Sequence, residues 1–370
     1  MCAIIAATAL LDAPRANADP LQASPETLTT SAQQANARTG ASFVVAPIPL
    51  SDPAIGSGLG FGAMALYHKD ADGRPWTTGL GGFYADSSSW AVAIFHKAHF
   101  HNDLYRLTAI GGYGDFNLDF FGIGQNAGQR AHSVAMEEEG GGGLVDVLVR
   151  VRPHLYFGLR YRGAAVNTTF KTLDVLPPEL QLPDIQLESK TSALGFAAEY
   201  DTRDSEYNPR RGLLADAQYI FPDQAFGGDF DYQRVNVALN GYHGLGASTV
   251  LAWRGSMCWS SDGAPFYDLC SFGAQNDLRG YQAGQYRDHA MFAVQTELRQ
   301  HLFWRVGGTA FVGVGEVAHA FGDISSDDLL PAAGFGLRLE ASKQYRINVS
   351  ADLAVGDHSS GFYFYIGEAF

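Results

Sequence analysis

Leu155-Tyr156-Phe157-Gly158-Leu159-Arg160-Tyr161-Arg162 divides its side chains between two faces. The odd positions carry bulky apolar or aromatic groups, and the even positions include glycine and two arginines. A period of two is the pattern of a β-strand. In a soluble sandwich the apolar face would have to meet a second sheet. One bulky apolar face opposite one charged and small face is typical of a wall between lipid and water, where Lys or Arg at mid-bilayer costs about 2–4 kcal/mol.

The same division recurs along the chain, for example at 291–302 and 345–355. About sixteen such segments can be counted: 42–48, 57–68, 75–85, 88–99, 103–116, 131–151, 153–166, 191–203, 212–221, 229–243, 247–258, 289–301, 306–319, 331–342, 345–356 and 362–370. Even numbers of strands close single-chain bacterial barrels. Short and long connections alternate, the long ones at 117–130, 167–190 and 259–288. The sequence therefore predicts an all-β, antiparallel transmembrane barrel.

Composition agrees with a barrel and excludes several other classes. The 370 residues include 43 glycines, and aromatic residues make up 12% while charged residues make up only 17%, against about a quarter in soluble domains. Beyond the N-terminus no run of 18 apolar residues is present, so no transmembrane helix is expected. The net charge of −14 argues against nucleic acid as a partner, because phosphate binding needs clustered Lys and Arg.

The N-terminus has the features of an export signal. An apolar stretch, Cys2 to Leu11, precedes the small-x-small triplet Ala16-Asn17-Ala18. We therefore expect a signal peptide over residues 1–18. A polar periplasmic extension is expected over 19–40 and the barrel over 41–370, which places the N-terminus in the periplasm.

Two cysteines remain after the predicted cleavage. Cys258 and Cys270 are twelve positions apart in an exported chain, where oxidation is favoured. We expect a disulfide between them, which would remove about 3 kcal/mol of unfolded-state entropy. Two free thiols are the alternative.

Two motifs in the second half of the chain resemble the surface-antigen barrel domain of the BamA/TamA family. The first resembles the family's D-x-R-D…P-x-x-G turn between two strands, and its matching residues are Asp201, Arg203, Asp204, Pro209 and Gly212. The second resembles the family's V-R-G-F/Y motif and consists of Leu278, Arg279, Gly280 and Tyr281. In the family this motif lies on a long sixth extracellular loop that folds into the lumen. The resemblance implies that Arg279 meets Glu297, an acidic residue on the polar face of the next strand.

Two further stretches extend the resemblance to the end of the chain. Phe311-Val312-Gly313-Val314-Gly315 resembles the family's F-x-D-x-G strand motif, with Gly313 in place of the Asp. The departure implies a latch that rests on Glu297 alone or is looser than in the family. The last residues resemble the β-signal that the barrel-assembly machinery reads on its clients, with Phe362, Phe364, Ile366 and Phe370 expected on one face and Gly367 loosening the seam between the last and first strands.

The resemblance implies an integral protein of the bacterial outer membrane that assists insertion or translocation of protein or lipid. Its expected partners are outer-membrane lipid and lipopolysaccharide, the assembly machinery for its own insertion, and a client protein or a second copy of itself. The family's assembly proteins carry polypeptide-transport (POTRA) repeats before the barrel. Only about 22 residues stand there in this sequence, which is typical of a barrel-only branch. A passive pore or structural barrel is the alternative, and a barrel that works with a periplasmic partner is a third possibility.

Other chemistry receives little support from the sequence. His96, His99 and His101 form the densest histidine cluster, but only His99 and His101 share a strand face. We expect rim histidines there and no metal site. No G-x-S-x-G motif is present, and His358 with its neighbouring serines has no matched partner for a hydrolase. The expectation is a protein that is not an enzyme and needs no cofactor.

Overall fold

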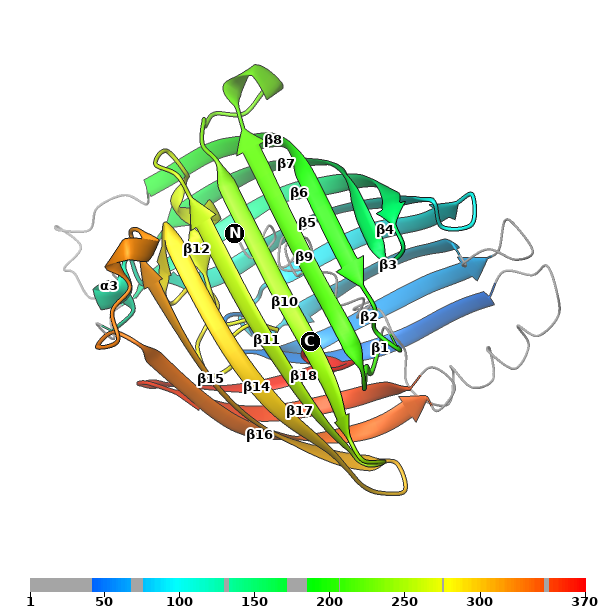
Figure 1. The fold of residues 1–370 in the computed structure, drawn as a ribbon. Coiled ribbons are helices and arrows are strands. Elements are labelled where there is room, and N and C mark those ends of the chain that lie inside the picture. The colour runs from blue at the N-terminus through cyan, green and yellow to red at the C-terminus, as the bar shows by residue number, and fades with distance from the viewer. Residues whose placement is uncertain are drawn as a thin grey trace.

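The structure is a computed structural model that describes residues 42–67, 76–129, 133–171, 185–205, 207–274, 276–342 and 346–370. The predicted signal peptide and nearly all of the predicted extension lie outside these residues. The predicted all-β architecture is confirmed: sixteen antiparallel strands close into one barrel (Figure 1).

The wall is an up-and-down ring in which each strand pairs with the next along the chain. The wall strands are β1 (Ser42–Asp52), β2 (Gly56–Tyr67), β3 (Trp76–Ala85), β4 (Trp90–Phe100), β5 (Tyr105–Phe120), β6 (Val134–Arg152), β7 (Leu155–Phe170), β8 (Ile185–Asp201), β9 (Gly212–Pro222), β10 (Arg234–Leu245), β11 (Thr249–Ser260), β14 (Ala290–Phe303), β15 (Val306–Ala318), β16 (Leu330–Ser342), β17 (Ile347–Gly356) and β18 (Ser359–Ile366). β18 returns to β1 and closes the ring. Two short strands, β12 (Cys270–Ser271) and β13 (Arg287–Asp288), pair only with each other.

The two faces of the wall have the chemistry that the alternation predicts. On β7, Arg160 and Arg162 face inward and are buried, whereas Leu159 points outward and is 60% exposed. On β6, Asp146 is buried between the exposed Val145 and Val147. Buried ion pairs therefore line the interior, such as Arg160 with Asp146 at 2.7 Å. Apolar side chains cover the outside, as a membrane-facing wall requires.

The connections differ between the two ends of the barrel. The turns that follow β4, β6, β10, β14 and β16 are short, and the longest connections lie at the other end. The long-loop end carries the helix α3 (Gln125–Gln129) and three 3-10 helices, η2 (Gln224–Phe226), η3 (Phe266–Asp268) and η4 (Phe321–Asp323). Of the helices that the structure describes, none has the length and apolar character to cross a membrane.

A charge on the outer face should cost more at mid-wall than at the rim. Val312 lies midway along β15 and is 62% exposed, and Leu302 lies near the short-turn end of β14 and is 53% exposed. We expect Val312→Arg to lower the free energy of unfolding in lipid by about 2–4 kcal/mol, and Leu302→Arg by about 0–1 kcal/mol. Urea titration in liposomes measures both values. Equal costs for the two variants would contradict the membrane position of this wall.

Candidate functional site

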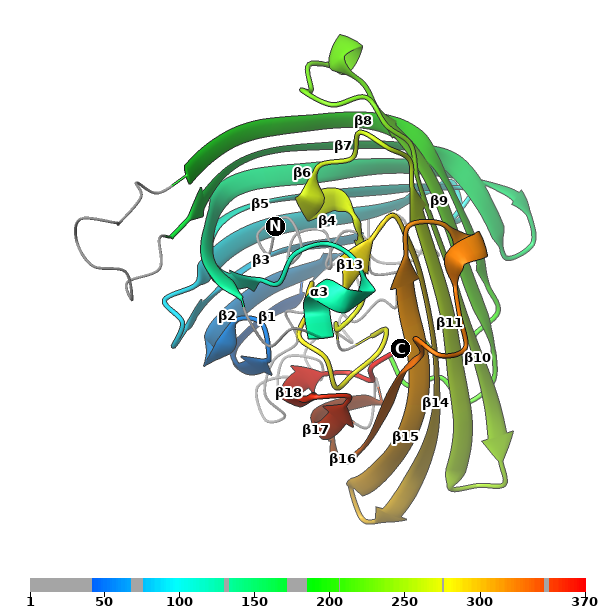
Figure 2. The same cartoon turned by 90° about the vertical axis from the view of Figure 1, so that its left-hand side faces the viewer.

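The segment between β11 and β14, residues 261–289, folds into the open end of the barrel and is called loop six here. Figure 2 shows this segment, in yellow, and α3 lying across the mouth of the ring. The predicted disulfide between Cys258 and Cys270 is present, with the two Cα atoms 5.6 Å apart, and it ties the start of loop six to β11. The loop is therefore covalently anchored before it enters the lumen.

Arg279 is the innermost cation of loop six and has no exposed surface. Its guanidinium donates to the carboxylates of Glu297 on β14 and Asp352 on β17. Its Cζ atom lies 3.5 Å from the ring centroid of Phe311 on β15, which is cation–π geometry. Arg279 also donates to the Tyr365 hydroxyl on β18 at 3.4 Å, so this one loop residue contacts four wall strands.

The pair extends into a larger buried ion network. Arg299 donates to Glu297 at 2.7 Å, and Arg338 donates to Glu368 at 2.8 Å and also to Asp352. Asn348 donates to the other oxygen of Glu368 at 2.5 Å, and Tyr365 donates to Asp352 at 2.6 Å. Three arginines face three carboxylates, so each buried charge has partners of opposite sign. Such compensation is what makes charges tolerable away from water.

The neighbours of Arg279 fit against glycines of the wall. A Cβ on Gly313 would lie 2.7 Å from Cδ1 of Leu278, and one on Gly315 would lie 3.0 Å from Cδ2 of the same side chain. Leu278 therefore occupies the space that side chains at 313 and 315 would fill. A Cβ on Gly356 would likewise lie 2.5 Å from the Tyr281 ring. These contacts fix the loop by shape as well as by charge.

Hydrogen bonds of main-chain groups and tyrosine hydroxyls also hold residues 278–281 in place. Gly280 donates its N–H to the Tyr363 hydroxyl at 3.0 Å, and Tyr363 donates to the Tyr281 carbonyl at 3.1 Å. The Tyr281 hydroxyl donates to the Pro331 carbonyl at 2.5 Å. Gly280 has φ +119°, a conformation that L side chains rarely adopt, and its Cα lies against the backbone of β17.

The expectation that the latch rests on Glu297 alone is wrong. Gly313 removes the acidic group from β15, but Asp352 on β17 supplies a second carboxylate to Arg279. The place of the missing side chain is filled by Leu278. Arg279 therefore meets two carboxylates, one on β14 and one on β17.

Loop six has a second anchor that sequence reasoning missed. Asp268 in η3 is 3% exposed and accepts hydrogen bonds from Arg162 on β7, Arg234 on β10 and Tyr232. Burial alone would raise the pKa of Asp268, but Arg162 and Arg234 outweigh it and hold the pKa below its usual range. The carboxylate is therefore charged at neutral pH.

The two anchors contact different parts of the wall, since Asp268 also contacts β10 and Arg279 also contacts β14. In the closed ring, seven strands lie between β7 and β17 in either direction. Asp268 contacts the first of these strands and Arg279 the second. Loop six therefore spans the lumen as a strut, with an ionic contact at each end.

The predicted turn motif lies at the short-turn end, away from the strut. Arg203 donates to both carboxylate oxygens of Asp201 at 3.0 Å, and Asp204 accepts from the main chain of Arg210 at 2.8 Å. Pro209 is buried. Gly212 has φ +107° and starts β9 directly against the main chain of residues 202–203. The motif shapes the turn between β8 and β9 and does not contact loop six.

The predicted single face of the C-terminal motif is only partly right. Phe362 is 46% exposed on the outer face, and Phe364, two residues on, shares that face. Gly367 has φ +98° and the chain turns inward there, so Phe370 is buried in the lumen, where Arg299 donates to its main-chain oxygen at 2.7 Å. Both ribbon views place this end of the chain inside the ring (Figures 1 and 2).

The histidines singled out from the sequence do not converge on a common point. His96 bonds through Nδ1 to Thr78 at 2.8 Å, and His99 bonds through Nδ1 to Asp103 at 2.8 Å. His101 has φ +51° and belongs to the turn. Each ring is used in local structure at the rim.

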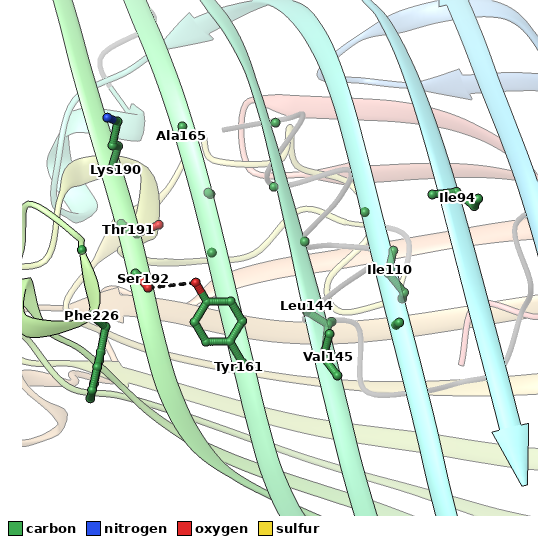
Figure 3. A pocket seen from close by; sticks show the side chains of 18 of the residues that line it. Ile94, Ile110, Leu144, Val145, Tyr161, Ala165, Lys190, Thr191, Ser192 and Phe226 are labelled. Atoms are coloured by element: carbon green, nitrogen blue, oxygen red, sulfur yellow. Dashed lines mark hydrogen bonds between the residues drawn. The ribbon is translucent and has the colours of Figure 1, made fainter.

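A shallow hollow of about 800 Å³ lies on the wall formed by β4 to β8 (Figure 3). Register explains it, because Ile94, Gly111, Gly143, Gly163 and Ser192 stand side by side across five strands. Because glycine has no side chain, this row leaves space next to the outward-facing Tyr161. The Tyr161 hydroxyl hydrogen bonds to Ser192 at 3.1 Å. The lining is mostly apolar, and we assign no chemistry to it.

The sequence contains a signal for two site residues that the motifs did not identify. Asp352 stands on the polar face of 345–355, and Arg299 stands on the polar face of 291–302, so period two places both in the lumen. It does not say which of the lumen charges meet. Asp268 lies in a loop without periodicity, and nothing in the sequence pairs it with β7 or β10.

Removing the Arg279 guanidinium should loosen the strut. We expect Arg279→Ala to lower folded yield or heat resistance, because Glu297 and Asp352 lose a shared cation. Such a loss costs about 3–5 kcal/mol in a dry site, and less where the lumen is hydrated. Arg211→Ala, which removes an exposed arginine at the short-turn end, is the matched control. If both variants resist heat like the wild type, the latch assignment fails.

The Asp268 anchor should weaken in acid. Its folded-state pKa lies below the unfolded value of about 3.9. Its contribution to stability is therefore present above about pH 4 and is lost as the pH falls through the folded value. Limited proteolysis of loop six between pH 3 and pH 7 measures this release, with Asp268→Asn as the variant. We expect the variant to be cleaved faster at pH 7 and to respond less to acid; identical pH profiles would contradict the anchor.

Known structures of similar fold include BamA and CdiB from bacteria. BamA from Haemophilus ducreyi lacking POTRA domains 1–3 matches with TM-score 0.58 and 18% identity, over 90% of this chain and 70% of that chain. CdiB from Acinetobacter baumannii and CdiB from Escherichia coli match with TM-scores of 0.55 and 0.54, each at 11% identity and over 88% of this chain. The chain spans 59% and 62% of those two CdiB chains. At these identities the likeness shows the fold.

Sequence comparison gives the family. No curated protein is a significant match to the chain. The family description "Omp85 superfamily domain" matches residues 70–370, which include every element of the strut and of the C-terminal motif. The chain therefore belongs to the Omp85 superfamily.

Proposed function

We propose that this barrel assists the insertion or translocation of protein or lipid at the bacterial outer membrane, and that the junction between β1 and β18 is the route. The proposal places the N-terminus in the periplasm and the long loops outside. Outer-membrane lipid, lipopolysaccharide and an unfolded client are the expected partners. The mechanism needs no catalytic group, because strand exchange and bilayer perturbation are changes of non-covalent contacts.

The observation that carries the proposal is the narrow pairing at this junction. Among the described residues, the register of β1 with β18 consists of Ser51 opposite Phe364, whereas β1 pairs with β2 over its whole length. β18 ends at Ile366, and the chain then turns into the lumen at Gly367. Within the part of the chain that the structure describes, most residues of β1 have no residue of β18 opposite them in the register. A backbone edge in lipid is costly, and it favours a partner that supplies the missing strand.

The sequence of β1 supports a weak edge. Pro47 and Pro49 lack N–H donors, and proline is confined to edge strands, strand starts and bulges. Since they are two positions apart, the missing donors lie on the same side of the strand. A strand that cannot donate along one side pairs poorly there. A junction that opens requires such a weakly paired edge.

The latch and the junction share residues, which suggests how opening is controlled. Arg338 bridges Asp352, a partner of Arg279, and Glu368, in the segment that follows β18. Arg299 bridges Glu297, the other partner of Arg279, and the main chain of Phe370. Withdrawing loop six would therefore disturb the residues that hold the C-terminal segment inside the lumen. We infer that the strut stabilises the closed arrangement.

A passive pore is the alternative function, and the contents of the lumen argue against it. The strut crosses the ring from β7 to β17, and α3 lies in the mouth (Figure 2). Conduction through such a barrel would depend on loop six. Steady single-channel conductance that is unchanged by cutting back residues 278–288 would favour the passive pore.

The seam can be tested with a reversible staple. Ser51 and Phe364 are directly opposite, a spacing compatible with a disulfide. We expect the protein reconstituted in liposomes to accelerate folding of an unfolded client barrel several-fold. In the variant with Ser51→Cys and Phe364→Cys, oxidation should abolish the acceleration and reduction should restore it, because the strands can then separate.

A staple elsewhere in the wall serves as the control. Phe335 and Leu353 are directly opposite on β16 and β17, and both face outward. Phe335→Cys with Leu353→Cys, treated with the same oxidant and reductant, should retain the acceleration; it also controls for reduction of Cys258–Cys270. Full activity of the oxidised seam staple would refute the route. No acceleration across several clients would favour the passive barrel.

A further inference from the structure

Two histidines meet at the long-loop end of β14 and β15. The last residue pair of this ladder is Ala290 opposite Ala318, so His289 and His319 are the next pair in the same register. Their ring centroids are 4.9 Å apart, with the ring planes at 78°. Neither residue belongs to the latch or to the junction of β1 with β18.

Asp288 completes the cluster. One ligand atom from each of Asp288, His289 and His319 lies within 4.8 Å of the other two. The Asp288 side chain is on a residue only 8% exposed, and it forms no ion pair with any residue that the structure describes. A buried carboxylate normally has a cation nearby. Here the nearest candidates are two imidazoles whose free nitrogens can serve as metal ligands.

The surrounding hydrogen bonds decide which nitrogen of His289 can bind a metal. His289 Nδ1 lies 3.1 Å from the Ser260 carbonyl, which can only accept, so Nδ1 carries the proton and Nε2 of the neutral ring has its lone pair available. A histidine that donates its other N–H to a carbonyl is the usual arrangement behind a metal ligand. Ser260 N–H donates to the His289 carbonyl at 2.7 Å, which also fixes the main chain of this ligand.

The backbone that carries Asp288 is fixed independently. Asp288 pairs with Cys270 in the small sheet of β12 and β13, and Cys270 is bonded to Cys258 on β11. His289 N–H donates to Asp288 Oδ1 at 2.8 Å. Two of the three candidate ligands therefore stand on an immobilised backbone, and the third directly follows the wall strand β15.

We propose that Asp288, His289 and His319 bind one divalent transition-metal ion of the Zn²⁺ type. Two imidazoles and one carboxylate are a known protein ligand set for Zn²⁺, and they leave one coordination position for water. His319 is exposed, so the ion can enter from the long-loop side. A hard cation such as Ca²⁺ is disfavoured, because it prefers six or more oxygen ligands.

The ion would add a further tie between loop six and the wall, besides the disulfide, Arg279 and Asp268. Asp288 and His289 stand where the loop returns to β14, and His319 begins the connection after β15. Metal binding would therefore link two loops at their bases, close to the disulfide of Cys258 with Cys270. The inference does not depend on transport activity, because the ligands and their supports are structural.

The test is titration of the full-length folded protein with Zn²⁺ after chelator treatment. We expect one equivalent to bind tightly by competition with a Zn²⁺-sensitive dye and to raise the unfolding temperature. His319→Ala and Asp288→Asn should each weaken binding at least tenfold and remove the thermal shift. Co²⁺ should bind with the visible absorption of a four- or five-coordinate site, which a structural role of the histidines would not produce.

Control variants separate this site from general histidine binding. His358→Ala removes an exposed histidine at the same end and should leave affinity unchanged. His99→Ala tests the rim cluster and should also have no effect. If His319→Ala folds poorly, heat-dependent mobility reveals it, and Asp288→Asn carries the test. The absence of tight one-to-one binding, or binding that survives both ligand substitutions, would overturn the proposal and leave a hydrogen-bonded imidazole–carboxylate cluster.

Discussion

The constraint on which the whole structure depends is that a backbone in lipid has no water to bond. Every strand must therefore find a partner on both sides, and a sheet can meet this demand only by closing on itself. Fifteen of the sixteen junctions satisfy it with long registers between consecutive wall strands. The sixteenth, between β1 and β18, does so over a short stretch. The barrel is therefore most weakly paired at this one junction.

Closure also creates an interior that must be filled with compatible chemistry. Inward positions carry arginines and carboxylates, and these are tolerated because they meet in networks. Loop six takes part at both of its ends, through Asp268 on one part of the wall and Arg279 on another. A loop that bridges opposite strands resists deformation of the ring in a way that wall hydrogen bonds do not. Its removal would leave buried charges on both parts of the wall with fewer partners.

The network around Arg279 combines charge and packing from several wall strands. Gly313 stands where the related motif has an acidic residue, and Asp352 on another strand provides the charge. Leu278 fills the space released on β15. Arg338 and Arg299 connect the same carboxylates to the C-terminal segment. The latch is therefore linked to the junction that we propose to open. Asp352 thus provides the charge, and Leu278 provides the packing.

The sequence by itself determined the wall of this protein and part of its site. Alternation with period two specified the strands and their faces and predicted about sixteen of them, because one face had to meet lipid and the other water. The family resemblance pointed to Arg279 and Glu297, and two cysteines in an exported chain predicted the disulfide of Cys258 with Cys270. Only the tertiary structure decided that Asp352 also meets Arg279, that Asp268 contacts β7 and β10, and that Phe370 turns inward. Periodicity reports which face a side chain takes, but a closed ring decides which distant strands oppose each other. The cluster of Asp288, His289 and His319 likewise exists only because the β14–β15 register brings positions 289 and 319 together.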